Sequence, residues 1–257
     1  MPRTRGPGTA PERSRTITPS MSDERPGLTQ APFAIAKRRR TAIVAGATGL
    51  VGRVVVDTLL ADAAIGAVHV LVRAERPDWR KRAGLTQHVV DYRKGLTILP
   101  AVDDAYCCLG TTIKVAGSQE AFRAVDFDAA LAFARAAQAA GATRMGLVSA
   151  LGADPKSGVF YNRVKGEAEH AIAALGFESM VIARPSLLLG DRAALGQPVR
   201  RGERIAAVLT APLGWLMPRA VRPIEAAVVA RALVRSVQRG EPGLFALSSG
   251  VLQLLGR

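Results

Sequence analysis

Apolar runs alternate with longer helical stretches along most of the chain, starting at Thr41. Continuous apolar strands that alternate with helices pair in parallel and are joined by right-handed crossovers. The pattern therefore predicts a doubly wound parallel α/β sheet, followed by a small, irregular C-terminal region. The predicted strands are 41–46, 67–73, 87–92, 104–110, 144–150, 178–186 and 244–248, and the predicted helices lie before 62 and at 118–140, 158–175 and 224–238.

The first forty residues differ in composition from the rest of the chain. They are rich in Pro, Arg, Ser, Thr and Gly and show little apolar periodicity, which is typical of a disordered segment. The sequence thus divides into a disordered basic tail at 1–40 and an α/β domain at 41–257, with a substrate region mainly at 186–257. We interpret the basic run at 37–40 as a solvated lead into the first strand.

Positive charge is spread over both parts of the chain. The formal net charge is +14, and residues 1–40 hold nine Lys/Arg against three Asp/Glu, so +6 falls on the tail and +8 on the remainder. This excess indicates an arginine-rich surface or a site for an anionic, phosphorylated ligand. Basic residues are not interleaved with aromatic ones, so we expect no nucleic-acid partner. No apolar run has the length of a bilayer span, so we expect no membrane partner.

The cysteines and histidines do not form an obvious site in the sequence. Cys107 and Cys108 are neighbours on a predicted strand, so their side chains point to opposite faces and are poorly placed for a disulfide. With no secretory signal, this favours a reducing, cytoplasmic environment. No metal site is predicted, because no two of the histidines have the spacing of metal ligands, and we expect surface or edge positions for His69, His88 and His170.

A glycine-rich turn follows the first predicted strand. Gly46, Gly49 and Gly52 have the spacing G-x-x-G-x-x-G between an apolar run and a helical stretch. In this context one glycine allows a sharp turn, one lets a pyrophosphate approach the backbone, and one lets helix and strand pack closely. The phosphates then meet free N–H groups at the positive end of the helix dipole. The motif predicts dinucleotide binding.

The end of the second predicted strand indicates which dinucleotide is bound. Proteins that bind NAD have an acidic residue there for the ribose hydroxyls. This chain instead has Arg73, with Arg76 three residues later and Arg53 just after the third glycine. A guanidinium can hold a 2′-phosphate through paired hydrogen bonds, whereas a carboxylate would repel it. We therefore predict NADP(H) in preference to NAD(H).

A tyrosine and a lysine share a face of the helix that follows the fifth predicted strand. Tyr161 and Lys165 are four residues apart in "YNRVKGEAE", and Ser149 ends the preceding strand. Ligands of parallel sheets bind at the carboxyl ends of the strands, so Ser149 is directed toward the crevice of the glycine turn. An ammonium group lowers the pKa of a nearby phenol and suits it to proton transfer, while a hydroxyl can stabilise charge on the substrate oxygen.

These motifs together resemble those of the atypical short-chain dehydrogenase/reductases, in particular the Tat-interacting oxidoreductase-like branch. The resemblance rests on "GATGLVGR", "SALGAD…YNRVKGEAE", "ARPSLLLGDR" and "CCLGTTIKVAG" and covers about 41–250. It implies a Rossmann fold, bound NADPH and a catalytic set of Ser149, Tyr161 and Lys165. It also implies that Pro185 flanks the nicotinamide end of the site. The predicted cofactor contacts are Gly46, Thr48, Gly49, Leu50, Val51, Gly52, Arg53, Arg73, Asp91, Leu109, Gly110, Thr111, Lys165 and Arg184.

One position departs from the wider family pattern. Many short-chain dehydrogenases have a water-holding asparagine on the long central helix, where this chain has Asp126. A carboxylate there adds negative charge beside the cofactor, which puts efficient turnover in doubt. Two functions remain open on this basis: an NADPH-dependent oxidoreductase with Tyr161 as general acid, and a catalytically weak NADP(H)-binding regulator or redox sensor. A nucleotide-sugar epimerase is disfavoured because the region after Pro185 is small.

The sequence does not specify the small-molecule substrate or the oligomeric state. The uncharged stretch 205–218, which contains Trp215 and Met217, could be a lid over substrate, part of the core or a patch for a partner. The apolar character of the final third of the chain, where such folds build their substrate pocket, suggests a weakly polar substrate that is not a sugar.

Overall fold

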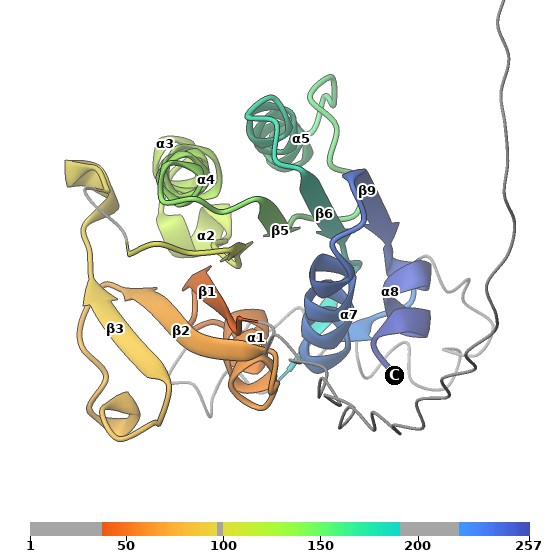
Figure 1. Ribbon diagram of the computed structural model, residues 1–257. Coiled ribbons are helices and arrows are strands. Elements are labelled where there is room, and N and C mark those ends of the chain that lie inside the picture. The colour runs from red at the N-terminus through yellow and green to blue at the C-terminus, as the bar shows by residue number, and fades with distance from the viewer. Residues whose placement is uncertain (1–37, 97–99, 191–220) are drawn as a thin grey trace, which may run out of the picture. The chain divides into compact units, whose positions relative to one another are not determined.

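Seven parallel strands form one sheet in the order β3-β2-β1-β4-β5-β6-β9 (Figure 1). The computed structural model describes residues 38–96, 100–190 and 221–257. This order confirms the predicted doubly wound Rossmann fold. The strands are β1 (Arg40–Ala45), β2 (Ile65–Val72), β3 (Leu85–Val89), β4 (Asp104–Cys107), β5 (Arg144–Val148), β6 (Ser179–Arg184) and β9 (Gly243–Ser248).

Two of the sequence predictions lie outside the described residues. The basic tail is described only from Arg38 onward, and the apolar stretch 205–218 falls wholly in the undescribed part. The structure therefore does not test either of them.

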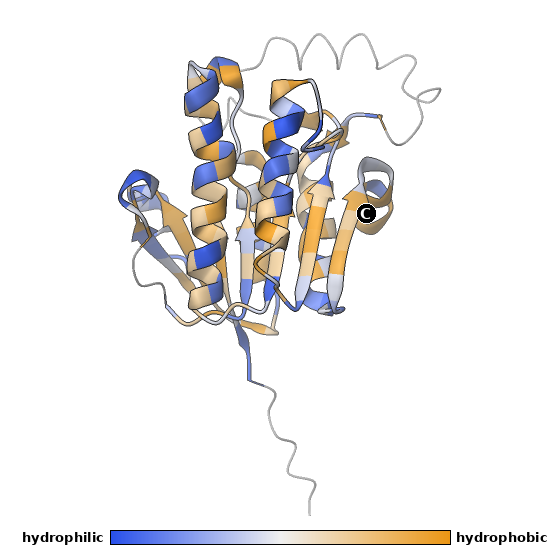
Figure 2. Cartoon of the chain, turned by 90° about the horizontal axis from the view of Figure 1, so that it is seen from above, coloured by the Kyte–Doolittle hydropathy of each residue, from blue (hydrophilic) through white to orange (hydrophobic). Residues whose placement is uncertain are grey.

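Helices cover both faces of the sheet, and each face has its own apolar core. One core joins α1 (Leu50–Leu60) and α7 (Ala226–Arg239) to the sheet, and the other joins α4 (Ala130–Ala139) and α5 (Phe160–Ala173). The neighbours Ile43 and Val44 on β1 are both fully buried and belong to opposite cores. Burial on both faces explains why the inner strands are continuous apolar runs (Figure 2), whereas the edge strands β3 and β9 are largely exposed or partly buried. The helices in the same view carry both polar and apolar residues.

The long predicted helix 118–140 is one helical run with three parts. It consists of α3 (Gln119–Arg123), a π-helical stretch η3 (Ala124–Ala129) and α4. The Ser118 hydroxyl caps its start by accepting the N–H of Ala121 at 3.0 Å. A short helix α2 (Ile113–Ala116) precedes it.

Several small elements were not predicted from the sequence. They are the 3₁₀ turns η1 (Pro77–Trp79) and η2 (Tyr92–Lys94), the paired two-residue strands β7 (Leu188–Leu189) and β8 (Ile224–Glu225), and the C-terminal helix α8 (Ser249–Leu255). Elements this short show too little periodicity for a sequence pattern to reveal them.

The adjacent cysteines follow the expected alternation. Cys107 is buried in the core beneath α4 and α5, whereas Cys108 packs against the core beneath α1 and α7. Both are free thiols. Burial raises the pKa of Cys107 to about 11, so its thiol stays protonated at neutral pH.

Candidate nucleotide-binding and catalytic site

The first glycine of the turn after β1 touches the backbone of β4. Gly46 has a φ of +73°, and a Cβ built on it would lie 2.4 Å from the carbonyl oxygen of Cys108. Both facts exclude other residue types, because positive φ strains an L-residue and no Cβ approaches an oxygen so closely. The turn is thus pressed against the carboxyl end of the central strands.

The third glycine brings α1 against the same turn. A Cβ on Gly52 would lie 2.2 Å from the carbonyl oxygen of Gly46. Gly49 is the N-cap of α1, makes no side-chain cap hydrogen bond, and donates its N–H to the Gly46 oxygen at 3.0 Å. No acidic residue lies in the first turn of α1. The cradle therefore has backbone room and positive helix-end potential for a diphosphate.

The predicted contacts Leu50, Val51 and Thr48 present different groups to this cradle. Leu50 and Val51 begin α1, where the first N–H groups lack partners within the helix. The Val51 side chain is buried in the core, so only its backbone can face a ligand. The Thr48 carbonyl accepts the Nε–H of Arg53 at 3.4 Å.

The three arginines near the predicted ribose-phosphate position have different surroundings in the structure. Arg73 is exposed directly after β2, and in the described part of the chain no ion pair involves it. Arg53 lies over the ring of the buried Trp79 at 5.9 Å. Arg76 is held by Asp78, with Nε 3.2 Å from the carboxylate. Of the three, Arg73 and Arg53 remain available for an anion. Trp79 beneath Arg53 was not predicted as part of this end.

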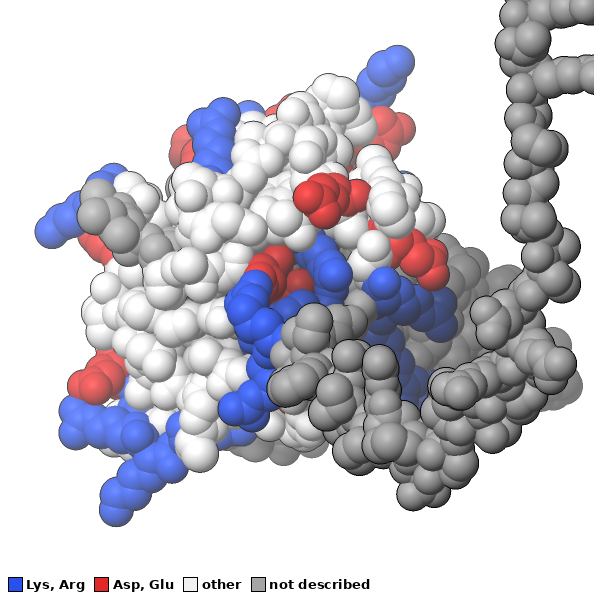
Figure 3. All heavy atoms as spheres, in the orientation of Figure 1, with Lys and Arg blue, Asp and Glu red and all other residues white. Residues whose placement is uncertain are grey.

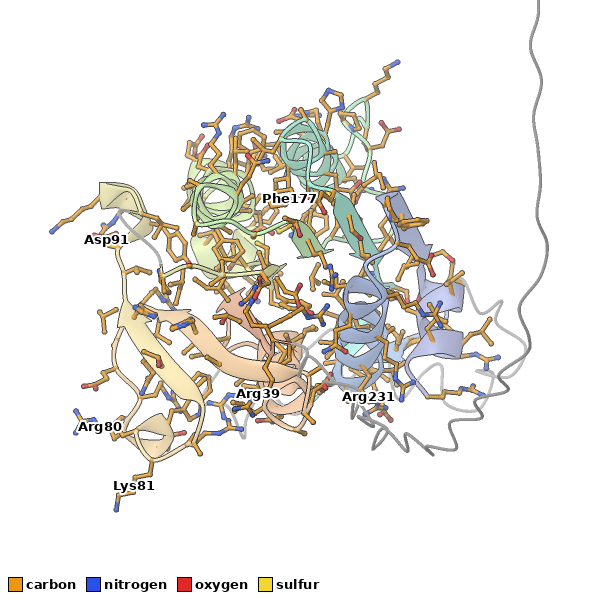
Figure 4. All side chains as sticks on the ribbon, in the orientation of Figure 1. Arg39, Arg80, Lys81, Asp91, Phe177 and Arg231 are labelled. Atoms are coloured by element: carbon orange, nitrogen blue, oxygen red, sulfur yellow. The ribbon has the colours of Figure 1, made fainter. Side chains whose placement is uncertain are left out.

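Asp91 has local partners at the end of β3. It caps η2 by accepting the backbone N–H of Arg93 at 3.1 Å, and its carboxylate also pairs with the Arg93 guanidinium at 3.1 Å. These hydrogen bonds from Arg93 lower the pKa of Asp91. Figure 4 labels Asp91 beyond β3, at the border of the sheet. Its predicted position near the adenine stays a prediction.

The residues after β4 lie beside the candidate catalytic lysine. The backbone N–H of Thr111 donates to Asp126 Oδ2 at 2.9 Å. A Cβ on Gly110 would lie 3.6 Å from both Asp126 Oδ1 and Lys165 Nζ. Leu109 packs against the core under α4 and α5. The predicted ribose-binding stretch and the predicted catalytic helix therefore meet at this point.

Lys165 is buried and paired with a carboxylate. Only 5% of the residue is exposed, and its Nζ lies 2.8 Å from Oδ1 of Asp126. Burial lowers the pKa of Lys165, but the negative charges of Asp126 and an ionised Tyr161 outweigh this, so its pKa is raised overall. The lysine is charged at neutral pH. At the position where many short-chain dehydrogenases have a water-holding asparagine, the structure pairs Asp126 directly with Lys165.

Tyr161 lies one turn before Lys165 on α5. Its ring packs against that of Phe122 with centroids 5.2 Å apart, which fixes the phenol between α5 and the central helical run. Ser149 follows β5 and is 6% exposed, and its Oγ is buried with no hydrogen-bond partner among the described residues. A buried hydroxyl without a partner suits a site that a ligand oxygen enters.

Arg184 ends β6 and is held by α5. Its Nε lies 3.0 and 3.1 Å from the carboxylate oxygens of Glu169, and Glu169 is 5% exposed. Because Glu169 follows Lys165 by four residues, it shares the helix face of Tyr161. This spacing was visible in the sequence, yet Glu169 was not singled out. Pro185 lies next along the chain, and its carbonyl accepts the N–H of Leu151 at 2.8 Å.

Two histidines meet elsewhere on the sheet. His69 Nδ1 lies 2.9 Å from His88 Nε2, on the neighbouring strands β2 and β3, although the residues are nineteen apart in sequence. Burial lowers the pKa of both rings, and the positive charge of His88 adds to the effect on His69. Within the described ranges, no three His, Cys, Asp or Glu side chains are grouped to hold a metal ion.

The sheet order and the glycine cradle at the carboxyl end of β1 are those of a nucleotide-binding Rossmann protein. Residues 46–207 match the family described as NAD(P)H-binding. The chain belongs to this family. Gly46 and Gly52, where a Cβ would collide with backbone atoms, fit such a cofactor, as does the Ser149 hydroxyl, which has no hydrogen-bond partner in the described ranges.

Curated relatives extend over most of the chain. Protein HTATIP2 of Rattus norvegicus is 32% identical over 225 residues, covering 85% of this chain and 86% of the relative. Protein fmp52, mitochondrial, of Emericella nidulans is 33% identical over 176 residues, covering 66% and 74%. The resemblance to the Tat-interacting oxidoreductase-like branch is thereby confirmed.

Solved structures agree on the fold. MoeE5 in complex with UDP-glucose and NAD has a TM-score of 0.60 at 17% identity, covering 80% of this chain and 75% of that one. ADP-L-glycero-D-manno-heptose-6-epimerase of Helicobacter pylori has a TM-score of 0.59 at 13% identity, covering 82% and 76%. At such identities these similarities concern the fold alone.

The location of the protein in the cell stays a prediction. The fungal relative is named as a mitochondrial protein, so the family is not confined to the cytoplasm. Among the helices of the described ranges, none is long and apolar enough to cross a membrane.

Proposed function

We propose that the chain is an NADPH-dependent oxidoreductase that reduces a carbonyl-like small molecule, with Tyr161 as the proton donor. The observation that carries this proposal is the arrangement on α5. Tyr161 precedes a buried, charged Lys165 by one turn, and Lys165 Nζ lies beside the Gly110 backbone in the loop after β4. The buried, unpartnered hydroxyl of Ser149 supplies a second polar group near the same strand ends.

Each of these residues has a defined part in the reaction. A bound NADPH would supply the hydride that adds to the carbonyl carbon. The Tyr161 hydroxyl gives its proton to the carbonyl oxygen, so that an alcohol forms and a phenolate remains. The Ser149 hydroxyl donates a hydrogen bond to the same oxygen while charge develops on it. The Lys165 ammonium stabilises the phenolate until solvent returns the proton.

Replacing Tyr161 with Phe tests the proton donor. Turnover of NADPH with a panel of aldehydes, ketones and quinones should fall by a factor of about 100 or more, because the proton donor is lost while the ring packing remains. Cofactor affinity should stay within about twofold. His170→Ala, an exposed position on the same helix, is the control and should keep full turnover. Equal turnover in wild type and Tyr161→Phe would contradict the proposal.

We also propose a preference for NADP(H). Arg73 is exposed at the end of β2 without an ion pair among the described residues, and Arg53 lies at the same end. Fluorescence titration of the wild type should give tighter binding of NADPH than of NADH. Arg73→Ala should weaken NADPH binding by about tenfold and leave NADH binding unchanged, because a charged hydrogen bond to the phosphate is lost. Arg80→Ala, an exposed arginine paired with Glu75 in the same connection, is the control. Equal wild-type affinities for NADH and NADPH would refute this preference.

A regulatory role is the second candidate, and the Asp126–Lys165 pair favours it. A lysine engaged by a carboxylate at 2.8 Å activates a phenol less than a solitary ammonium would. Tight cofactor binding with no turnover across the substrate panel would support a redox sensor.

We further propose a cytoplasmic location, which the two free thiols support and which a fluorescent fusion would test.

A further inference from the structure

Two arginines lie over one buried indole beside the nucleotide cradle. Trp79 ends the 3₁₀ turn η1 in the connection after β2, is 4% exposed and belongs to the core beneath α1 and α7. The guanidinium carbons of Arg53 and Arg82 lie 5.9 and 6.0 Å from the centre of its ring. A guanidinium at such a distance is attracted to the negative face of an aromatic ring. The indole is therefore a contact surface for two cations from different elements.

The two arginines differ in their other partners. Arg82 Nη2 lies 2.6 Å from Oδ1 of Asp57 on α1, so a carboxylate already balances its charge. Arg53 lies four residues before Asp57 on the same helix, and no ion pair among the described residues includes it. Its Nε donates to the Thr48 carbonyl at 3.4 Å. Of the two cations on the ring, Arg53 is the one that can still take an anion.

The carboxylate of η1 is held by a different arginine. Asp78 is exposed, and its Oδ1 lies 3.2 Å from Nε of Arg76. The hydrogen bond from Arg76 is the main cause that lowers the pKa of Asp78, whereas the charge of Arg53 contributes least. The Arg53 guanidinium thus keeps most of its charge for a ligand.

Arg53 also lies at the end of α1 that forms the cradle. It is the fourth residue of the helix, directly after Gly52, and its backbone N–H donates to the Gly49 carbonyl at 3.0 Å. The free N–H groups of this first turn face a diphosphate bound in the cradle. The side chain of Arg53 therefore starts close to the place where the rest of the nucleotide continues toward the end of β2.

Two contacts hold the Arg53 guanidinium before a ligand arrives. The Trp79 ring lies against it, and the Thr48 carbonyl engages its Nε. Its two Nη groups have no hydrogen-bond partner among the described residues, and such paired donors fit a phosphate. Fixing a long side chain on binding costs conformational entropy, and a guanidinium that is already held avoids most of that cost.

We infer that Trp79 is a positioning residue that holds the Arg53 guanidinium ready for the 2′-phosphate of NADP(H) and so strengthens discrimination against NAD(H). The inference rests on the proposed preference for NADP(H). It does not depend on carbonyl reduction, because the discrimination is a property of cofactor binding.

Two substitutions at position 79 test the aromatic face. Trp79→Leu removes that face but keeps an apolar side chain, whereas Trp79→Phe keeps a smaller ring. Calorimetric titration gives the ratio of NADPH to NADH affinity, which should fall about fivefold in Trp79→Leu and about twofold in Trp79→Phe. The affinity for NADH should stay within about twofold of wild type.

The ratio separates positioning from mere structural support. Loss of packing alone would weaken both cofactors equally and leave the ratio unchanged. An unchanged ratio in either folded variant overturns the inference. If Trp79→Leu does not fold, Trp79→Phe decides the question.

A double substitution tests whether the effect passes through Arg53. Arg53→Ala should weaken NADPH binding by about tenfold, because a charged hydrogen bond to the phosphate is lost. Adding Trp79→Leu to Arg53→Ala should cause no further fall in the ratio. A further fivefold fall would show that Trp79 acts by another route and would overturn the inference.

Arg82→Ala is the matched control. It removes the other cation from the same ring, and the ratio should stay within about twofold of wild type. A fall as large as that in Trp79→Leu would assign the phosphate contact to Arg82 and overturn the role of Arg53.

Side-chain NMR of the protein without cofactor tests the positioning directly. The ring current of Trp79 should shift the Arg53 Nε–H proton upfield in wild type, and the shift should vanish in Trp79→Leu. Arg53→Ala identifies the signal by its loss. An Arg53 signal at the position of a free arginine in wild type would overturn the inference.

The titrations distinguish this inference from the cofactor preference on which it rests. Equal affinities of the wild type for NADPH and NADH would refute the preference and the phosphate contact together. A preference that persists unchanged in the Trp79 variants would refute the inference alone.

Discussion

Single residues set the shape of the nucleotide cradle. Gly46 and Gly52 each occupy a place where a Cβ would collide with a backbone carbonyl, at 2.4 and 2.2 Å. Neither neighbour is a flexible side chain, so the collision could be relieved only by moving the turn or α1. The cradle therefore requires glycine at both positions, because no side chain fits there.

A methyl group at position 52 tests this account. Gly52→Ala should lower the free energy of unfolding by about 2 kcal/mol or more and abolish NADPH binding, because α1 must move away from β1. Gly158→Ala is the matched control, since a Cβ there meets nothing within 4 Å. Denaturant unfolding and cofactor titration check both variants. Wild-type stability and affinity in Gly52→Ala would contradict the packing argument.

The sequence predicted those site residues whose role depends on their spacing within one or two neighbouring elements. The glycine turn and the Tyr161–Lys165 pair are defined by spacing within one or two elements, so the sequence showed them. The Asp126–Lys165 and Arg184–Glu169 contacts join different elements, and their partners follow from packing rather than from spacing. The same is true of His69 and His88, which meet only because β2 and β3 are neighbours.

At the scale of elements, the central helical run connects the site to the core. It begins after its N-cap Ser118, widens in the π-helical stretch around Asp126 and continues as α4 against the sheet. The sequence predicted its extent within a residue at each end, because alanine-rich periodicity is a strong signal. The π-helical widening was not predicted, since it leaves no mark on residue types.

The cap at Ser118 should contribute measurably to this element. Ser118→Ala should lower the free energy of unfolding by about 1 kcal/mol, because the Ala121 N–H loses its acceptor. Ser118→Asp keeps an acceptor and should remain within about 0.5 kcal/mol of wild type. Thermal and urea unfolding measure both changes. A loss in the aspartate variant as large as in the alanine variant would show that the cap is not the cause.

At the scale of the whole molecule, the two edges of the sheet differ in chemistry. The carboxyl edge carries the candidate site, whereas charges gather at the amino edge (Figure 3). There Asp104 at the start of β4 is fully buried, 3.3 Å from Arg40 Nε and 3.8 Å from Arg144 Nη1. Burial raises the pKa of Asp104 to about 6 and outweighs the opposing effect of Arg40.

This buried carboxyl makes stability depend on pH in a specific direction. Its pKa is higher in the folded than in the unfolded chain, so folding favours the protonated form. Its contribution is therefore largest below pH 4 and is lost as the pH rises toward 6, by on the order of 3 kcal/mol. Asp104→Asn stays neutral at every pH. Its free energy of unfolding should therefore rise relative to that of wild type by about 3 kcal/mol between pH 4 and pH 7.

Urea unfolding at several pH values measures that difference. Asp78→Asn is the control, because Asp78 is an exposed carboxylate whose pKa is lowered by its hydrogen bond to Arg76. Its difference from wild type should be small and of the opposite sign. A constant difference between Asp104→Asn and wild type across this pH range would exclude Asp104 as the titrating group.

The packing of α1 against α7 has a consequence for biosynthesis. The apolar side of α1, made early in translation, is covered by a helix that begins at residue 226, and β9 joins the sheet later still. A growing chain therefore cannot complete this half of its interior until residues 226–248 have left the ribosome. Emergence of α7 and β9, rather than emergence of the glycine turn, should mark the moment at which the protein first holds a dinucleotide.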